Sequence, residues 1–180
     1  MRAVLDACVL YPTVLREILL RLAATGAFAP LWSGRILEEW ARAARKLGAG
    51  QEVVARGEIA LLRAHWPGAE VAVRADTEAR LWLPDPDDIH VLAAAIDGGA
   101  DMIVTFNLQD FPKRALDAEA MLLRHPDAFV TEAHGRDPEA VARVVASVHA
   151  EAERLSGAHL PLRALLKRAG LPRLGKALAG

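Results

Sequence analysis

The residue types best suited to chemistry gather in segment 83–111, whose sequence is LPDPDDIHVLAAAIDGGADMIVTFNLQDF. An acidic loop supplies Asp85, Asp87 and Asp88, and we expect an alanine-rich helix, a Gly-Gly stop and a short apolar strand ending near Asn107 to follow. In an open α/β sheet, the beginnings of helices and the ends of strands lie along the same edge, where ligands bind. We therefore expect Asp88 and Asn107 to approach each other in the folded chain.

A further carboxylate, Asp6, follows the first apolar run of the chain, RAVL. Several carboxylates at one edge of a sheet repel one another, so a bound cation is the natural way to hold them together. Turn formation and helix capping explain one aspartate of the acidic loop well and three poorly. For Asp6 taken alone, capping of the next helix explains the residue as well as metal binding does. Together these residues predict a divalent-metal site and metal-dependent phosphodiester chemistry.

Other polar residues carry weaker indications of function. Thr105, Asn107 and Asp110 follow an apolar run and are suited to orienting water or phosphate, although on their own they favour a simple turn. The side chains of Glu38 and Glu39 point in different directions on a helix, so at most one can face the acidic edge. Taken alone, that pair is typical of a solvated helix surface.

Several familiar catalytic patterns are missing from the sequence. No histidine stands beside Cys8 to activate it, so we interpret the cysteine as a small buried residue rather than a nucleophile. His90 is interpreted as a packed or solvent-facing residue and not as a general base. The histidines show no zinc-like spacing, and the glycines match neither a phosphate-binding loop nor GxGxxG.

Composition limits the class of protein. A chain of 180 residues with 53% hydrophobic residues is long enough for one well-buried domain with an appendage. With 22 basic and 23 acidic residues, the chain lacks the net positive charge that is typical of nucleic-acid-binding proteins. Local groups such as Arg42, Arg45 and Lys46 would therefore have to contact a polyanion. One cysteine, no secretory signal and no apolar run of about 20 residues indicate a cytoplasmic protein without a membrane span.

Hydrophobic periodicity predicts helices that alternate with short strands, which favours an α/β fold with a parallel sheet covered on both faces. We expect an α/β domain over residues 1–132 and a helical extension with a basic end over residues 133–180. Expected strands are 2–5, 71–73, 102–105 and 128–130, and expected helices begin near Thr13 and Pro138 and span 33–47, 51–65, 89–97 and 113–124.

Four sequence blocks carry a family resemblance: LDACVLYP, WSGRILEEW, PDPDDIHVLAAAI and ADMIVTFNLQDFP. In order and spacing they resemble the acidic motifs of PIN-domain proteins, in the branch that includes VapC-like toxins of bacterial toxin–antitoxin pairs. The resemblance covers roughly residues 1–130, and the tail resembles the C-terminal helical extension of some longer members. It implies a three-layer α/β/α sandwich with a central parallel sheet.

The resemblance also implies a ribonuclease that depends on Mg²⁺ or Mn²⁺. By its blocks, Asp6, Glu39 and Asp88 match the metal-binding and catalytic acids, and Asn107 stands where many relatives carry Asp. Additional site residues implied by position are Asp85, Asp87, Thr105 and Asp110, with Arg42, Arg45 and Lys46 as RNA contacts. The implied partners are an RNA substrate, a cognate antitoxin and a second copy of the chain, for which the apolar helix 14–22 is the candidate interface.

Two alternatives remain open from the sequence. A non-catalytic PIN-like module would bind RNA or protein without cutting, and Asn107 leaves room for it. A receiver-like signalling domain would accept a phosphate on one of its clustered aspartates. That class needs a lysine at a late strand end, which segment 128–132 lacks.

Overall fold

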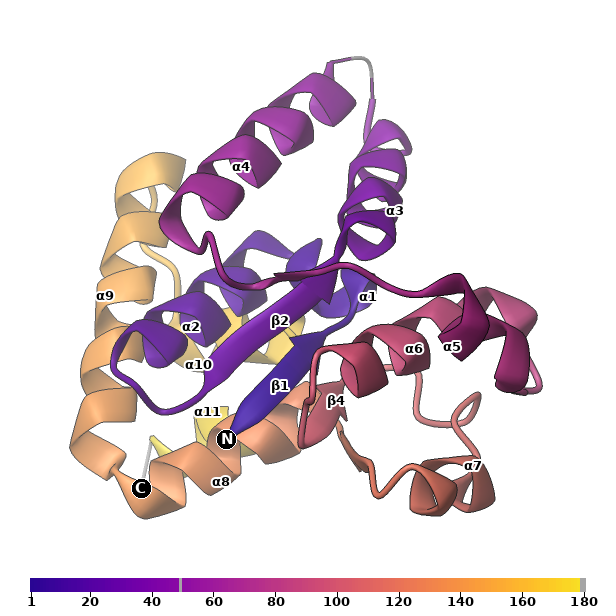
Figure 1. Cartoon of the computed structure of the whole chain (residues 1–180). Helices are drawn as coiled ribbons and strands as arrows, with labels where there is room; N and C mark the ends of the chain where they lie inside the picture. The colour runs from indigo at the N-terminus through magenta and orange to yellow at the C-terminus, as the bar shows by residue number, and fades with distance from the viewer. Residues whose placement is uncertain (49, 179–180) are drawn as a thin grey trace. The chain divides into compact units, whose positions relative to one another are not determined.

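A computed structural model describes residues 1–48 and 50–178 of the chain. Its centre is a five-stranded sheet in the order β3-β2-β1-β4-β5, and every neighbouring pair of strands is parallel. The strands are β1 (Arg2–Leu5), β2 (Ala29–Ser33), β3 (Glu70–Val71), β4 (Met102–Val104) and β5 (Leu122–Arg124). Helices flank the sheet, as Figure 1 shows, so the predicted α/β fold with a central parallel sheet is confirmed.

The chain forms two compact units. The first contains the whole sheet and consists of Met1–Tyr11 and Ala29–Arg124, and the second joins Pro12–Phe28 to the chain from His125 onward. The predicted division into residues 1–132 and 133–180 stays a prediction. In the first unit the helices are α1 (Ala7–Leu10), α3 (Gly34–Arg45), α4 (Gln51–His65), α5 (Ala75–Arg80), α6 (Ile89–Asp97) and α7 (Lys113–Ala118), with a 3-10 turn at Pro86–Asp88.

The strand order creates a switch point between β1 and β4. From β1 the chain continues to β2 on one side, whereas β4 pairs with β1 on the other side, with Val4 opposite both Leu31 and Ile103. The carboxyl ends of β1 and β4 therefore lie next to each other, and loops that leave them in different directions open a crevice there. Asp6 and Thr105 are the first residues after these two strands.

Helix α6 brings the acidic loop to the same place. Its residues from His90 to Ala95 are all buried, as expected of a helix that packs against β1, β2 and β4. The helix ends at Gly98 and Gly99, and Gly99 has φ of +58°, which confirms the predicted Gly-Gly stop. A Cβ on Gly98 would lie 2.8 Å from the carbonyl oxygen of Ala94 and 2.9 Å from Cγ2 of Val71, so this close approach to β3 requires glycine.

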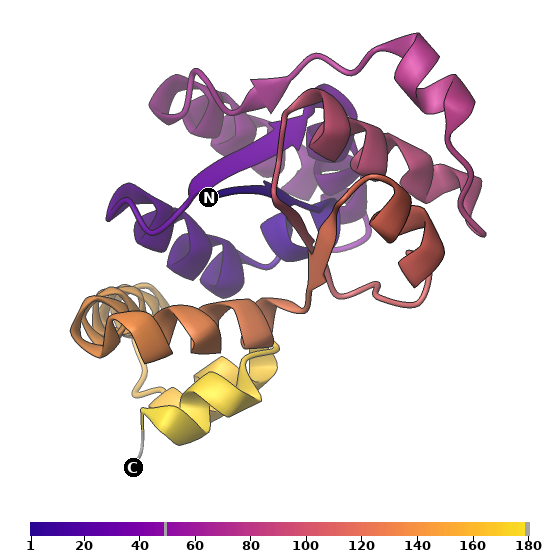
Figure 2. The ribbon, with the colours of Figure 1, turned by 60° about the horizontal axis from the view of Figure 1, so that its bottom comes forward.

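The second unit is helical in its described residues. It contains α2 (Thr13–Ala24), α8 (Pro126–Arg136), α9 (Pro138–Ser156), α10 (Leu162–Arg168) and α11 (Pro172–Ala177). Figure 2 shows α8 beside α10 and α11, and α2 packs against α9. The buried carboxylate of Asp127 accepts hydrogen bonds from the backbone N–H groups of Arg173 (2.9 Å) and Leu174 (3.1 Å), so α8 holds the beginning of α11. No helix within 1–48 or 50–178 is both long and apolar enough to span a membrane.

Two sequence predictions about the elements are wrong. Segment 113–124 is not one helix: α7 ends at Ala118, Ala120 adopts a positive φ of +51°, and β5 follows. Segment 128–130 is not a strand but lies in α8, where Phe129 packs edge-on against Phe28 with ring centroids 5.0 Å apart. The predicted beginning of a helix near Thr13 is confirmed, because α2 begins at this residue.

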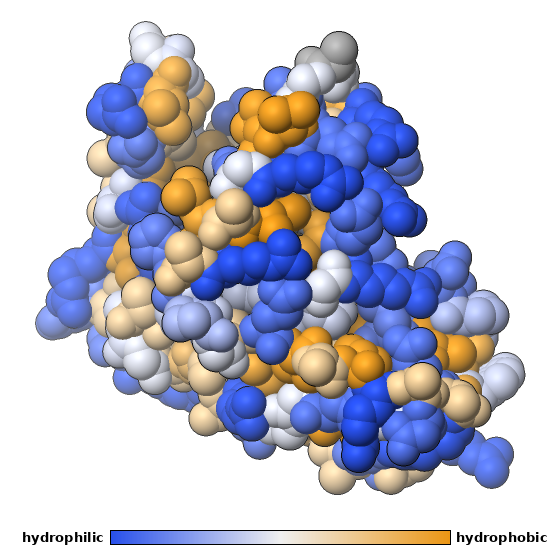
Figure 3. Space-filling view, turned by 45° about the horizontal axis from the view of Figure 1, so that its top comes forward, coloured by the Kyte–Doolittle hydropathy of each residue, from blue (hydrophilic) through white to orange (hydrophobic). Residues whose placement is uncertain are grey.

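The predicted dimer interface also needs correction. Leu15, Ile18, Leu19 and Leu22 of α2 are buried within the chain, so they are not available to a second copy. Exposed apolar side chains instead occur on α4, where Val53, Val54 and Leu61 face solvent. Figure 3 shows such hydrophobic side chains between hydrophilic ones on the face that carries α4.

Candidate metal centre

Asp6 occupies the end of the central strand and is almost fully buried. Its Oδ1 accepts a hydrogen bond from the N–H of Ala7 (2.6 Å), so Asp6 caps α1. Capping of the next helix was one of the two roles predicted for this residue. Its Oδ2 accepts hydrogen bonds from the hydroxyl of Thr105 (2.6 Å) and the thiol of Cys8 (3.2 Å). These bonds fix the carboxylate at the switch point.

Thr105 connects Asp6 to the next acidic group. Its Oγ1 accepts a hydrogen bond from the N–H of Asn107 (3.0 Å), which closes the turn after β4. The amide Nδ2 of Asn107 then donates to Oδ2 of Asp88 (2.9 Å). The predicted approach of Asp88 and Asn107 is therefore confirmed, across 19 residues of sequence.

Asp88 is the centre of a group of three carboxylates. One oxygen from each of Asp85, Asp88 and Asp110 lies within 4.8 Å of the others. Burial, followed by the negative charges of Asp6, Asp85 and Asp110, raises the pKa of Asp88 to about 6. This shift shows that the folded chain disfavours the charge on Asp88 when no cation is present.

Glu39 lies on α3, and its carboxylate contacts the side chains of His90 and Arg35. Its Oε1 is 2.8 Å from Nε2 of His90 and 3.4 Å from Nε of Arg35. Arg35 also reaches Asp87, with 3.4 Å between Nη2 and Oδ1. Arg35, Glu39 and Asp87 line a hollow of about 440 Å³ together with Glu38 and Arg42.

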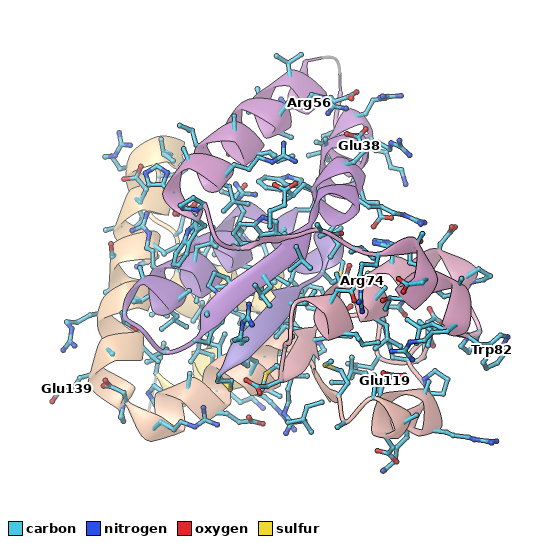
Figure 4. The ribbon with its side chains drawn as sticks, viewed as in Figure 1. Glu38, Arg56, Arg74, Trp82, Glu119 and Glu139 are labelled. Carbon is cyan, nitrogen blue, oxygen red and sulfur yellow. The ribbon has the colours of Figure 1, made fainter. Side chains whose placement is uncertain are left out.

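Glu38 borders the same hollow, but its carboxylate faces α4 and not the acidic group. Its carboxylate accepts hydrogen bonds from Arg56 and Arg42, which lower its pKa to about 2. Figure 4 shows Glu38 and Arg56 directed at each other from α3 and α4. The expectation that only one of the two glutamates faces the acidic edge agrees with these contacts.

The site residues predicted from the sequence therefore do not all meet at one point, and instead make neighbouring but separate contacts. Within the described residues, the oxygens that meet within 4.8 Å belong to Asp85, Asp88 and Asp110, and not to the set of Asp6, Glu39 and Asp88. Asp6 is near enough for its charge to raise the pKa of Asp88, and Glu39 touches His90, which lies two residues after Asp88. Asp85 and Asp110, which the sequence ranks as additional residues, are the carboxylates that form this group with Asp88.

Two contacts were not predicted from the sequence. Burial, followed by the charge of Asp6, raises the pKa of Cys8 to about 12, so its thiol stays protonated and donates to Asp6. His90 is only 1% exposed and neither ring nitrogen has a well-aligned hydrogen bond within the described chain, although Nε2 lies close to Glu39. The only available sequence signal was position: Cys8 and His90 each stand two residues after a site aspartate.

The proposed RNA-contacting cations are largely occupied. Arg42 is paired with Glu38 (3.1 Å) and Arg45 with Glu52 (2.7 Å), both on the surface. Lys46 is exposed and lines a hollow of about 530 Å³ between α3 and α4. Exposed ion pairs are weak, so phosphate can compete for these arginines. Their role in RNA binding stays a prediction.

The donor set fits a hard divalent cation. Carboxylate oxygens are the ligands that Mg²⁺ and Mn²⁺ prefer, and three of them converge with an amide close by. Burial, and then the charges of the neighbouring aspartates, raises the pKa of Asp88, and a bound cation would offset the cost of the charged form. We conclude that the site is compatible with metal binding at the switch point of an α/β sheet, a combination found in metal-dependent hydrolases.

Comparison with known families identifies the class more closely. The sequence profile of the PIN domain matches residues 2–109 of the 180, so the chain belongs to the PIN-domain family. PIN domains are generally nucleases, which makes nucleic acid the substrate class and disfavours the receiver-like alternative. No curated protein and no solved structure matches the chain.

Proposed function

We propose that this protein is an endoribonuclease that hydrolyses RNA phosphodiester bonds with the help of Mg²⁺ or Mn²⁺. The observation that supports this proposal most is the group of carboxylates formed by Asp85, Asp88 and Asp110. Burial and the charges of these neighbours and of Asp6 raise the pKa of Asp88. Asp6, Glu39, Asp88 and Asn107 would hold the ion directly or through water, with Asp85 and Asp110 completing the acidic edge.

The ion, when bound, would supply a Lewis acid that lowers the pKa of water and stabilises negative charge developing on the phosphate. The chain's own residues prepare the site for it. Thr105 and the N–H of Ala7 fix both oxygens of Asp6, and Asn107 fixes one oxygen of Asp88. Such fixed ligands need little reorganisation when an ion and substrate arrive.

Neither Cys8 nor His90 supplies a nucleophile or base in this proposal. The thiol of Cys8 remains protonated because its pKa is about 12. The ring of His90 lies against Glu39 and is 1% exposed, so it is not accessible from solvent. Proton abstraction from water therefore falls to the carboxylates of the site.

We further propose that the protein is the toxin of a type II toxin–antitoxin pair, with a cognate antitoxin and a second copy of itself as protein partners. The similarity of its four sequence blocks to VapC-like toxins supports this role. Exposed Val53, Val54 and Leu61 on α4 provide apolar surface for a protein partner. A neighbouring reading frame that encodes a small DNA-binding protein, and its co-purification with this chain, would test the pairing.

One observation favours a second candidate, a PIN domain that binds RNA or protein without cutting. Asn107 places a neutral amide beside Asp88 where a further carboxylate would strengthen metal binding. A cleavage assay separates the two candidates. Single-stranded RNA is incubated with Mg²⁺ or Mn²⁺ and wild-type protein, Asp88→Asn or Glu38→Gln.

The nuclease proposal expects cleavage by wild type and Glu38→Gln and a loss of at least about 100-fold in Asp88→Asn. Glu38 is a matched control because it lies on α3 beside Glu39 but pairs with Arg42 and Arg56. RNA binding without cleavage by every protein would favour the non-catalytic domain.

A further inference from the structure

One large aromatic side chain stands in solvent beside the acidic edge. Trp82 is 73% exposed, whereas Trp32 and Trp40 are buried and Trp66 is half-buried. Figure 4 shows it projecting outward from the loop between α5 and α6. A tryptophan left this exposed in a fixed loop is a feature of binding surfaces.

The backbone on both sides of Trp82 is anchored. Before it, Arg80 binds the carboxylate of Glu119 with both Nη1 (2.5 Å) and Nη2 (2.9 Å). After it, Leu83 is only 1% exposed, and Oδ1 of Asp85 accepts a hydrogen bond from the N–H of Asp87 (2.9 Å). The loop therefore presents Trp82 without having to be ordered by a ligand, which reduces the entropy lost on binding.

This loop also carries part of the metal centre. Trp82 precedes Asp85 by three residues, so their Cα atoms are at most about 11 Å apart, even in a fully extended chain. On the other side of the acidic group, Leu108 is 41% exposed and follows Asn107, the partner of Asp88. Exposed apolar surface therefore occurs on both loops that deliver the carboxylates.

Charge alone gives this edge little affinity for a polyanion. The carboxylates repel phosphate, and the acidic residues that pair with Arg35, Arg80 and Lys113 offset part of the positive charge of these cations. Stacking of a base on an aromatic side chain provides affinity that does not depend on a basic groove. It also requires an unpaired base, because bases within a duplex are already stacked.

We propose that Trp82 is a stacking platform for an unpaired base of a nucleotide close to the scissile phosphate, so that this site selects single-stranded substrate. The inference rests on the proposed function for the presence of a nucleic-acid substrate. It assigns Trp82 to substrate binding and not to the hydrolytic step. A protein partner is the other ligand class for an exposed tryptophan, and the proximity to the carboxylates favours the nucleotide.

The test measures binding of a labelled single-stranded RNA by fluorescence anisotropy in Ca²⁺, with a gel to confirm that the RNA stays intact. Trp82→Ala should raise Kd by about 5- to 150-fold, the range expected for one lost stack, and Trp82→Phe should recover most of the affinity. Leu61→Ala, at another exposed apolar residue, on α4, should leave Kd unchanged.

A second arm identifies the base. When single nucleotides of the RNA are replaced in turn by abasic ones, the effect of Trp82→Ala should vanish at one position and persist at the others. In the cleavage reaction, Trp82→Ala should raise KM more than it lowers kcat, because stacking contributes equally in the ground and transition states.

Equal Kd values for wild type and Trp82→Ala would overturn the stacking role. If both proteins still cleaved RNA, the proposed nuclease function would stand. An affinity loss that no abasic position abolishes would also overturn it. Weakened binding of a protein partner with unchanged RNA binding would assign Trp82 to a protein interface. Absence of RNA binding by wild type and of cleavage in Mg²⁺ would refute the proposed function itself.

Discussion

Replacement of Asp88 by Asn should make the metal-free protein more stable at neutral pH. The pKa of Asp88 rises from 3.8 to about 6 on folding because of burial and the charges of Asp6, Asp85 and Asp110. At about 1.4 kcal/mol per pH unit, this rise corresponds to about 3 kcal/mol. Part of the carboxylate contacts water, so screening reduces the expected effect to about 1–2 kcal/mol.

The pH dependence has a definite sign. Between about pH 4 and pH 6 the native state binds more protons at Asp88 than the unfolded state does, so the free energy of unfolding falls as pH rises. Asp88→Asn removes this titration and can keep the hydrogen bond with Nδ2 of Asn107 through its own amide oxygen. Its stability advantage should therefore grow from pH 4 to pH 7 and then stay constant.

Urea unfolding in EDTA at several pH values measures this difference. Asp87→Asn is the matched control, since it removes the same charge one residue earlier from a side chain that is 92% exposed. Added Mg²⁺ should then stabilise wild type and not Asp88→Asn, because binding to the native state alone raises stability. An Asp88→Asn protein that is no more stable than wild type at pH 7 would refute the account of the acidic group.

Three further predictions address the site and its support. Asp6→Asn should abolish Mg²⁺-dependent RNA cleavage while the circular dichroism spectrum stays near that of wild type; retained cleavage would remove Asp6 from the proposed machinery. Gly98→Ala should destabilise the chain by about 1–3 kcal/mol because its Cβ would lie 2.8 Å from the carbonyl oxygen of Ala94, and urea unfolding without a loss would contradict that packing. Asp127→Ala should cost about 1–3 kcal/mol in the same assay, since two backbone N–H groups lose their acceptor, and Asp127→Asn should recover part of it.

The sequence was most informative where topology alone decides the geometry. Asp88 begins the helix that precedes β4 and Asn107 follows β4, so a parallel sheet brings them to one edge whatever the details of packing. The end of α6 at Gly98 and Gly99 was likewise predictable from local chemistry, because glycine is favoured where a helix stops.

The incorrect predictions concern short apolar segments. Segments 122–124 and 128–130 both contain a short apolar run, and periodicity cannot distinguish a strand from one turn of a buried helix at that length. Tertiary contacts decide: residues 122–124 pair with β4, whereas Phe129 packs against Phe28 from α8. The left-handed turn at Ala120 that separates α7 from β5 has no glycine to announce it.

Long-range side-chain contacts of the site were also beyond the sequence. Asp110 joins Asp85 and Asp88 only because the loop after β4 folds back towards the acidic loop before α6. The contact of Glu39 with His90 depends on how α3 packs relative to α6, and the sequence gives only the helical face of each residue. Composition and spacing can nominate such residues, but the distances between them follow from packing.

A crystal of the wild-type protein grown with Mn²⁺ and measured near the manganese absorption edge tests the central claim most directly. The account predicts an anomalous peak within ligand distance of the Asp88 carboxylate, next to Asp85, Asp110 or Asp6, and its loss in Asp88→Asn. Anomalous density only at other carboxylates of the surface, or a bound ion unaffected by Asp88→Asn, would contradict it.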